Sequence, residues 1–262
     1  EKNVKLYCAF LANESKKIDL FIPEHRGYVG SNKINKNSIW FGKLRKNEIK
    51  KVKIKKIKTQ KSSDFIKINK ISPNIIKLDI EGGELSFLQG LKDKDFLNTT
   101  AILTELENHP TYINQSVHSD IHNFLLSKGF LAVKMSILEE KLNIFHKDDF
   151  VPEGISSIYL KKNFLNPKYL NDSDKINLLN VCYILDLYGI FFDIFSKDPT
   201  IFKRNKNNIY NQHIKKMVGT HINELQKDIT MNKKYLYNLY KKAFSSDLPR
   251  LNKFNEDNFF ND

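Results

Sequence analysis

Residues 75–91 read Ile-Ile-Lys-Leu-Asp-Ile-Glu-Gly-Gly-Glu-Leu-Ser-Phe-Leu-Gln-Gly-Leu, the order expected of a strand, a glycine turn and an amphipathic helix. The apolar run at 75–80 suits a strand that is covered on both faces. After the turn, leucines at every third position give the helix an apolar stripe. The strand therefore delivers two carboxylates, Asp79 and Glu81, to the sheet edge where α/β enzymes place their chemistry.

The position of Asp79 has two interpretations. A carboxylate at the end of a strand is either a functional group in the crevice of the sheet or an acidic start to the next helix, favoured by the helix dipole. The spacing alone does not decide between them.

The same stretch resembles the signature of the FkbM family of methyltransferases. That signature runs Lys-hydrophobic-Asp-hydrophobic-Glu-Gly-small-Glu, followed by Leu and Leu-x-Gly, and here it stands at Lys77–Leu85 and Leu88–Gly90. Upstream, residues 3–10 look like the strand that the family places before an inserted hairpin, and Gly30-Ser31 with residues 51–57 fits the rest of that insertion. The resemblance covers residues 3–160.

Downstream, residues 102–107 resemble the family's next parallel strand, which also ends in Glu and is often followed by His, here His109. The resemblance implies an α/β fold: an incomplete Rossmann-like class I methyltransferase sheet in a partial domain at residues 1–162, then an all-helical extension at 163–262. The segment Gly154–Leu160 resembles the family's final strand, which is antiparallel to its neighbours.

One part of the family pattern is absent from this sequence. None of the ten glycines forms the Gly-x-Gly loop that admits S-adenosylmethionine close to the backbone. The chain also opens with Glu1 where the family's third strand would begin. We therefore expect a fragment without the cofactor-binding half, in which the strand at 75–80 is a sheet edge apart from residues 4–11, or is collapsed onto them. We also expect this chain alone to bind S-adenosylmethionine no better than background.

The wider pattern alternates strands with helices, which implies a largely parallel sheet. Within the first 161 residues, strands are expected at 4–11, 18–22, 51–57, 75–80, 101–107, 130–135 and 155–161, and helices at 84–91 and 118–128.

Past residue 162 the pattern is helical. An apolar helix is expected at 172–196, and further helices at 207–229 and 233–244. These 172–244 helices are the candidate surface for a protein partner. A rival to the enzyme hypothesis is therefore a non-catalytic binding or assembly module, in which a methyltransferase-like remnant carries a helical docking region.

The resemblance implies S-adenosylmethionine-dependent O-methyl transfer to a hydroxyl of a sugar, glycan or small metabolite. Methyl transfer needs a base for the hydroxyl proton, and Asp79 and His109 are the candidates. Glu81 and Glu105 are expected to orient the acceptor or the base. In the complete enzyme, backbone near Ala9 and Phe10 is expected to flank the adenine.

Composition bears on the partners. The net charge of +13 invites a nucleic-acid hypothesis, but only four of the 43 basic residues are arginine, the residue that reads bases and clamps phosphates. We therefore expect no nucleic-acid partner. His118 and His122 are four residues apart, yet nothing fixes a third ligand, so no metal is expected. Two cysteines and no visible signal peptide suit a cytoplasmic protein without a transmembrane segment.

Overall fold

The computed structural model describes residues 4–141, 150–166, 168 and 170–204. The chain forms two compact units, Glu1–Lys162 and Asn163–Asp262, which are described separately below. The first unit is mixed α/β, and the described part of the second is helical.

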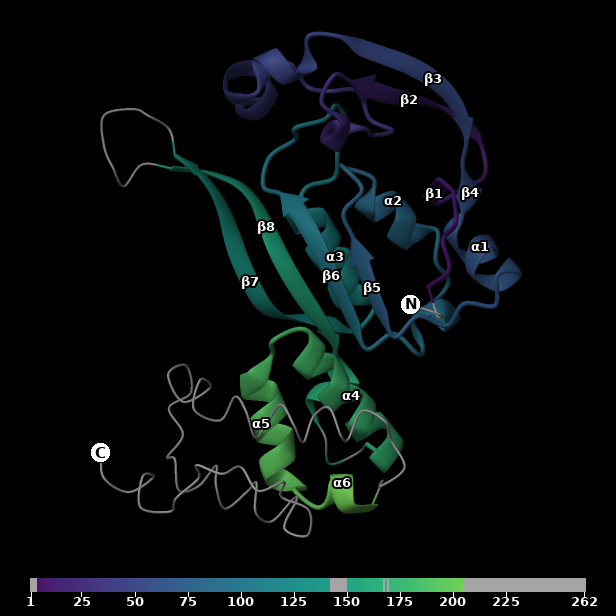
Figure 1. Ribbon diagram of the computed structural model, residues 1–262, viewed down its shortest axis with the longest axis vertical. Helices are drawn as coiled ribbons and strands as arrows, with labels where there is room; N and C mark the ends of the chain where they lie inside the picture. The colour runs from purple at the N-terminus through teal and green to yellow at the C-terminus, as the bar shows by residue number, and fades with distance from the viewer. Residues whose placement is uncertain (1–3, 142–149, 167, 169, 205–262) are drawn as a thin grey trace. The chain divides into compact units, whose positions relative to one another are not determined.

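The main sheet of the first unit has four strands in the order β5-β6-β8-β7 (Figure 1). Strands β5 (Ile75–Leu78) and β6 (Ala101–Glu107) are parallel. Strand β8 (Phe150–Lys161) is antiparallel to β6 and to β7 (Phe130–Lys141), with which it forms a long ribbon. The predicted antiparallel final strand is therefore confirmed.

Strand β5 lies at the edge of this sheet, because within the described residues it pairs with β6 alone. The expectation that the strand before Asp79 forms an edge, apart from residues 4–11, is confirmed. The predicted strand at 4–11 is wrong: only Leu11–Ala12 (β1) is extended and paired, parallel to β4 (Gln60–Lys61). Val4 and Leu6 are 72% and 91% exposed, so their alternation has no sheet to pack against.

The predicted hairpin insertion is present as β2 (Lys17–Pro23) paired antiparallel with β3 (Val52–Lys58). Between them run three short helical turns: η1 (Arg26–Tyr28), η2 (Trp40–Leu44) and η3 (Lys46–Ile49). This segment has its own small core, separate from the core of the sheet, formed by Ile34, Trp40, Phe41, Ile49 and Tyr112.

Four helical segments accompany the sheet: α1 (Ser62–Ile68), α2 (Glu84–Gln89), η4 (Asp93–Phe96) and α3 (His118–Ser127). Helix α3 lies against the sheet (Figure 1), where Ile121 and Leu125 join the main core. Helix α2 ends at Gly90, where a Cβ would lie 2.2 Å from the carbonyl oxygen of Ala12. Only glycine lets β1 approach α2 this closely.

In the second unit, η5 (Lys162–Leu165) precedes α4 (Asp172–Ile184), α5 (Tyr188–Lys197) and α6 (Ile201–Arg204). The single helix predicted at 172–196 is wrong. The chain breaks between α4 and α5 because Asp186 is left-handed (φ 53°) and the amide of Leu187 turns back to donate to the Cys182 carbonyl, at 2.7 Å. The predicted helices at 207–229 and 233–244 lie outside the described residues.

Within the part of the chain that the structure describes, none of the helices is both long and apolar enough to span a membrane.

We predict that Phe192→Asp destabilises the second unit. Phe192 is 1% exposed and packs against Phe191 and Phe195, with ring centroids 5.3 and 6.4 Å away. An unpaired charge buried there should cost about 3 kcal/mol or more. Ile184→Asp, at a residue 59% exposed in α4, is the matched control. Thermal melts of both variants check this, and equal shifts would show that Phe192 is not in a packed core.

Candidate active site

A tight turn joins the end of β5 to the start of α2. Glu81 is left-handed with φ 53°, a conformation that a non-glycine residue rarely adopts, and Gly82 follows with φ 87°. The Glu84 carboxylate accepts a hydrogen bond from the amide of Ile80 (3.0 Å) and so closes the turn on itself. Asn32 of the insertion donates its side-chain amide to the carbonyl of Gly82 (3.1 Å).

The insertion also touches the turn at Gly30, where a Cβ would lie 2.9 Å from the carbonyl oxygen of Glu81. Gly30 is bridged to Phe21 of β2 by two backbone hydrogen bonds, which hold it in place. The glycine noted in the sequence therefore lets the hairpin approach the backbone of the turn.

This turn separates two cavities, and its residues divide between them. One cavity is lined by Lys77, Leu78, Ile80, Gly82 and Gly83. The other is lined by Asp79, Glu81 and Glu84. The carboxylates therefore all face one side of the turn, and we call that side the acidic cavity and the opposite side the larger cavity.

The acidic cavity has a volume of about 190 Å³ and joins carboxylates to aromatic rings. Its lining residues are Asp79, Glu81, Glu84, Glu105, Glu107, Tyr28, Trp40, Phe41, Thr111 and Tyr112. The ring of Phe41 contacts those of Tyr28 and Tyr112 edge to face, at centroid distances of 5.1 and 5.5 Å. These contacts fix the aromatic wall that the insertion builds opposite the strand ends.

Glu81 is the carboxylate most clearly adapted for proton transfer. Its Oε2 accepts a hydrogen bond from the hydroxyl of Tyr112, at 2.7 Å. Burial raises the pKa of Glu81 to about 7, and the negative charges of Asp79, Glu84 and Glu105 add to that rise, while the bond from Tyr112 opposes it. Glu81 therefore exchanges its proton near neutral pH.

Glu107 lies at the end of β6, and its pKa is also raised, to about 8, by burial and then by the charges of Glu84 and Glu81. Its Oε2 accepts a hydrogen bond from the side-chain amide of Gln115. Burial likewise raises the pKa of Glu84. The side chain of Asp79 is 51% exposed and forms an ion pair with Lys77 at 3.4 Å.

The structure brings most of the sequence-predicted residues to these cavities. Asp79, Glu81 and Glu105 line the acidic cavity, and Ala9 and Phe10 line the larger one. His109 lines neither, and its Nε2 is buried without a hydrogen-bond partner. Within the described residues no cluster of three His, Cys, Asp or Glu side chains is arranged to hold a metal ion.

Sequence reasoning missed Glu84, Glu107 and the aromatic wall. Glu84 belongs to the family motif at the start of α2, and Glu107 lies two residues after Glu105, on the same face of β6. These two could have been found from spacing. Tyr112 reaches the cavity from the segment between β6 and α3 and Trp40 from η2, and no periodicity indicates them.

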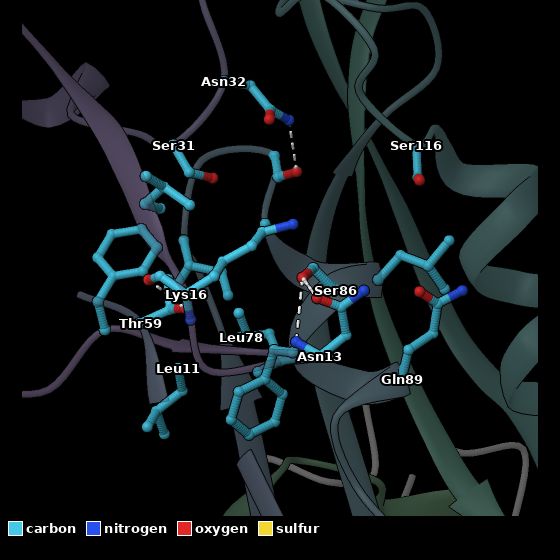
Figure 2. A pocket seen from close by; sticks show the side chains of 18 of the residues that line it. Leu11, Asn13, Lys16, Ser31, Asn32, Thr59, Leu78, Ser86, Gln89 and Ser116 are labelled. Atoms are coloured by element: carbon cyan, nitrogen blue, oxygen red, sulfur yellow. Dashed lines mark hydrogen bonds between the residues drawn. The ribbon is translucent and has the colours of Figure 1, made fainter. Parts of the chain in front are cut away.

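The larger cavity, about 530 Å³, lies between β1, β5, α2 and the hairpin (Figure 2). Asn13 and Ser86 meet in it: the backbone amide of Asn13 donates a hydrogen bond to the hydroxyl of Ser86, at 3.3 Å. Phe10 and Phe87 supply apolar surface, and Lys16 and Lys77 supply positive charge. In the part of the chain that the structure describes, neither Asp nor Glu lines this cavity.

Two cavities that share a wall at the carboxyl end of a parallel strand define the class, an α/β protein with candidate ligand sites at a strand end. The chain belongs to the FkbM methyltransferase family: the family model described as "Methyltransferase FkbM domain" matches residues 1–132. Every residue that lines the two cavities lies within that range. Among curated proteins and among solved structures, nothing matches the chain.

We predict that Tyr112→Phe raises the pKa of Glu81 above about 7. The lost hydroxyl bond stabilises the ionised carboxylate, and its removal should shift the titration by about one unit. Carbon-13 NMR titration of the glutamate carboxyls measures this. Tyr159→Phe is the control, because the Tyr159 hydroxyl contacts His122 instead, at 3.1 Å. An unmoved Glu81 midpoint would mean that Tyr112 does not stabilise the carboxylate.

Proposed function

We propose that this chain acts in S-adenosylmethionine-dependent O-methylation of a hydroxyl on a sugar, glycan or other small metabolite, with the acidic cavity as the acceptor site. The observation that supports this most directly is the shared turn. It presents a near-neutral carboxyl, Glu81, on one side and a cavity of cofactor size on the other. The methyl donor and the acceptor can therefore approach the same strand end from opposite sides.

Glu81 is the proposed general base. Methyl transfer to oxygen is an in-line displacement, and the hydroxyl must lose its proton as the new bond forms. A base works best when its pKa lies near the working pH, and the pKa of about 7 for Glu81 meets that condition. The geometry favours Glu81 over Asp79, which is half exposed and paired with Lys77, and over His109, which lies outside the cavity.

Asp79 and Glu105 are the proposed acceptor-binding groups. Both line the same cavity as Glu81, and carboxylate oxygens accept hydrogen bonds from neighbouring hydroxyls of a polyol. The apolar face of a sugar ring can rest on the aromatic wall. A cavity of about 190 Å³ suits one small ring or the terminal unit of a larger acceptor.

The larger cavity fits the cofactor in part. Its volume of about 530 Å³ is in the range of cofactor sites, Phe10 and Phe87 offer apolar surface for an adenine, and Lys16 suits a carboxylate group. Among the described residues that line it, none is an Asp or Glu that could hold the ribose hydroxyls. S-adenosylmethionine supplies a methyl group on a sulfonium sulfur when bound. In this proposal the main sheet is part of a Rossmann-like methyltransferase sheet, supported by parallel β5 and β6 and antiparallel β8.

We predict weak cofactor binding by the 262-residue chain. Because the lining offers amides and hydroxyls in place of an acid for the ribose, calorimetric titration with S-adenosylmethionine should give no saturable binding at micromolar concentrations. Bovine serum albumin under the same conditions measures the background. Saturable micromolar binding would show that the residues of the larger cavity suffice without the family's Gly-x-Gly loop.

We predict that Glu81→Gln lowers methyl transfer on the order of a hundredfold or more, because glutamine keeps the shape but cannot accept the proton. Asp79→Asn should lower it less, on the order of tenfold, chiefly through KM. Product is measured by mass spectrometry with the full chain, millimolar S-adenosylmethionine and monosaccharide acceptors. Asp93→Asn is the control, since the Asp93 side chain is 85% exposed in η4.

Two results bear on the alternatives. If Asp79→Asn removes turnover and Glu81→Gln does not, the base is Asp79. If the wild-type chain transfers no methyl group to any hydroxyl acceptor, the proposed function is wrong and the hypothesis of a non-catalytic binding or assembly module is favoured.

A further inference from the structure

Gln115 is a buried polar residue that the proposed mechanism leaves unused. It lies in the segment between β6 and α3 and is 7% exposed. It lines neither cavity, although Thr111 and Tyr112 before it line the acidic cavity and Asn114 and Ser116 beside it line the larger one. Its side chain therefore lies behind the wall of the site.

The orientation of the Gln115 side-chain amide follows from its neighbours. Its Oε1 accepts three hydrogen bonds: from the amide of Thr111 (2.8 Å), the hydroxyl of Thr111 (3.0 Å) and the amide of Tyr112 (3.0 Å). Because only the oxygen of a glutamine amide can accept, the nitrogen must be the atom that faces Glu107. Nε2 therefore donates to Oε2 of Glu107, and any proton that Glu107 holds sits on its other oxygen.

The same side chain contacts the turn after β5. A Cβ on Gly82 would lie 3.3 Å from both Cγ and Nε2 of Gln115, so Gln115 packs directly against this glycine. It also fixes the backbone of Tyr112, whose hydroxyl donates to Glu81. One amide thus connects the end of β6, the turn after β5 and the loop that carries Tyr112.

We propose that Gln115 is a positioning residue that holds Glu107 directly, and Glu81 through Tyr112, at a fixed separation across the acidic cavity. Glu81 and Glu107 come from different strand ends, and the charge of Glu81 raises the pKa of Glu107. Asp79, Glu84 and Glu105 also face Glu81, and Glu84 faces Glu107. The kinetic consequence rests on the proposed function, while the titration of the two carboxyls does not.

The direct test is Gln115→Glu, which keeps the shape and the acceptor for all three donors and replaces only the donor to Glu107. Two carboxyl oxygens then face each other and must share a proton, so the apparent pKa values of the Glu81 and Glu107 pair should rise by one unit or more in carbon-13 NMR. The kcat–pH profile should move to higher pH, with the acceptor KM within about twofold. Gln60→Glu is the matched control, because Gln60 lies in β4 and is not among the residues that line either cavity.

A measurement on the unchanged protein guards against a variant that does not fold. The side-chain amide protons of Gln115 should shift with pH at the same midpoint as Glu107, about 8. The proposal is overturned if these protons do not titrate between about pH 6 and 9. It is equally overturned if folded Gln115→Glu leaves the carboxyl titrations where they are in wild type. Shifted titrations in a chain that transfers no methyl group would support the positioning role and reject only the proposed function.

Discussion

The site depends on one backbone constraint, the left-handed conformation of Glu81 at the end of β5. A non-glycine residue adopts it only where its surroundings compensate the strain. Here the compensation comes from three sides: the Glu84 carboxylate on the amide of Ile80, the close approach of Gly30, and the Tyr112 hydroxyl on the Glu81 side chain. Two of these contacts come from the insertion and from the β6–α3 segment, so parts of the chain remote in sequence support the conformation of the turn.

The charge of the acidic cavity is opposite to the net charge of the chain. The protein carries a net +13, yet the described residues that line the acidic cavity include five carboxylates and neither lysine nor arginine. Four of the lysines lie on β3, where most of the side chains face solvent. A buried carboxylate without a cation beside it costs free energy in its ionised form, and the raised pKa values of Glu81 and Glu107 express that cost. The net charge therefore says little about the chemistry of this site.

The sequence predicted the parts of the fold whose signal is local. The apolar run before Asp79, the glycines after it and the leucine stripe specify strand, turn and helix without help from the rest of the chain. The hairpin alternation of β2 and β3 was equally readable. Residues 4–10 were expected to form a strand as well, but the structure assigns them to none, and among them the Phe10 carbonyl alone is recorded in a backbone hydrogen bond, from the amide of Gln60. Neither glycine nor proline stands at residues 185–187 to indicate the break between α4 and α5. The break is made by the backbone hydrogen bond from the amide of Leu187 to the carbonyl of Cys182.

The site was predictable only where it follows the strands. Asp79, Glu81 and Glu105 were found because strand ends of a parallel pair meet at one edge of the sheet. The aromatic wall could not be predicted from the strands. Trp40 and Phe41 of η2 meet Tyr112 of the segment between β6 and α3 only through tertiary packing. Sequence reasoning named Asp79 and His109 as the candidate bases without any measure of burial. Burial is a property of the assembled fold, and it is what separates Glu81 from Asp79.

The protonated carboxyls have a consequence for folding itself. In the unfolded chain Glu81 and Glu107 have the ordinary glutamate pKa of 4.5. In the native state their pKa values are raised to about 7 and about 8, respectively. Between these values the folded protein binds more protons than the unfolded one, so folding takes up protons and the free energy of unfolding falls as pH rises. Their contribution is fully present below about pH 4.5 and is lost as pH passes through 7 and then 8. The groups that suit the site to neutral chemistry thus make the fold more tolerant of acid than of base.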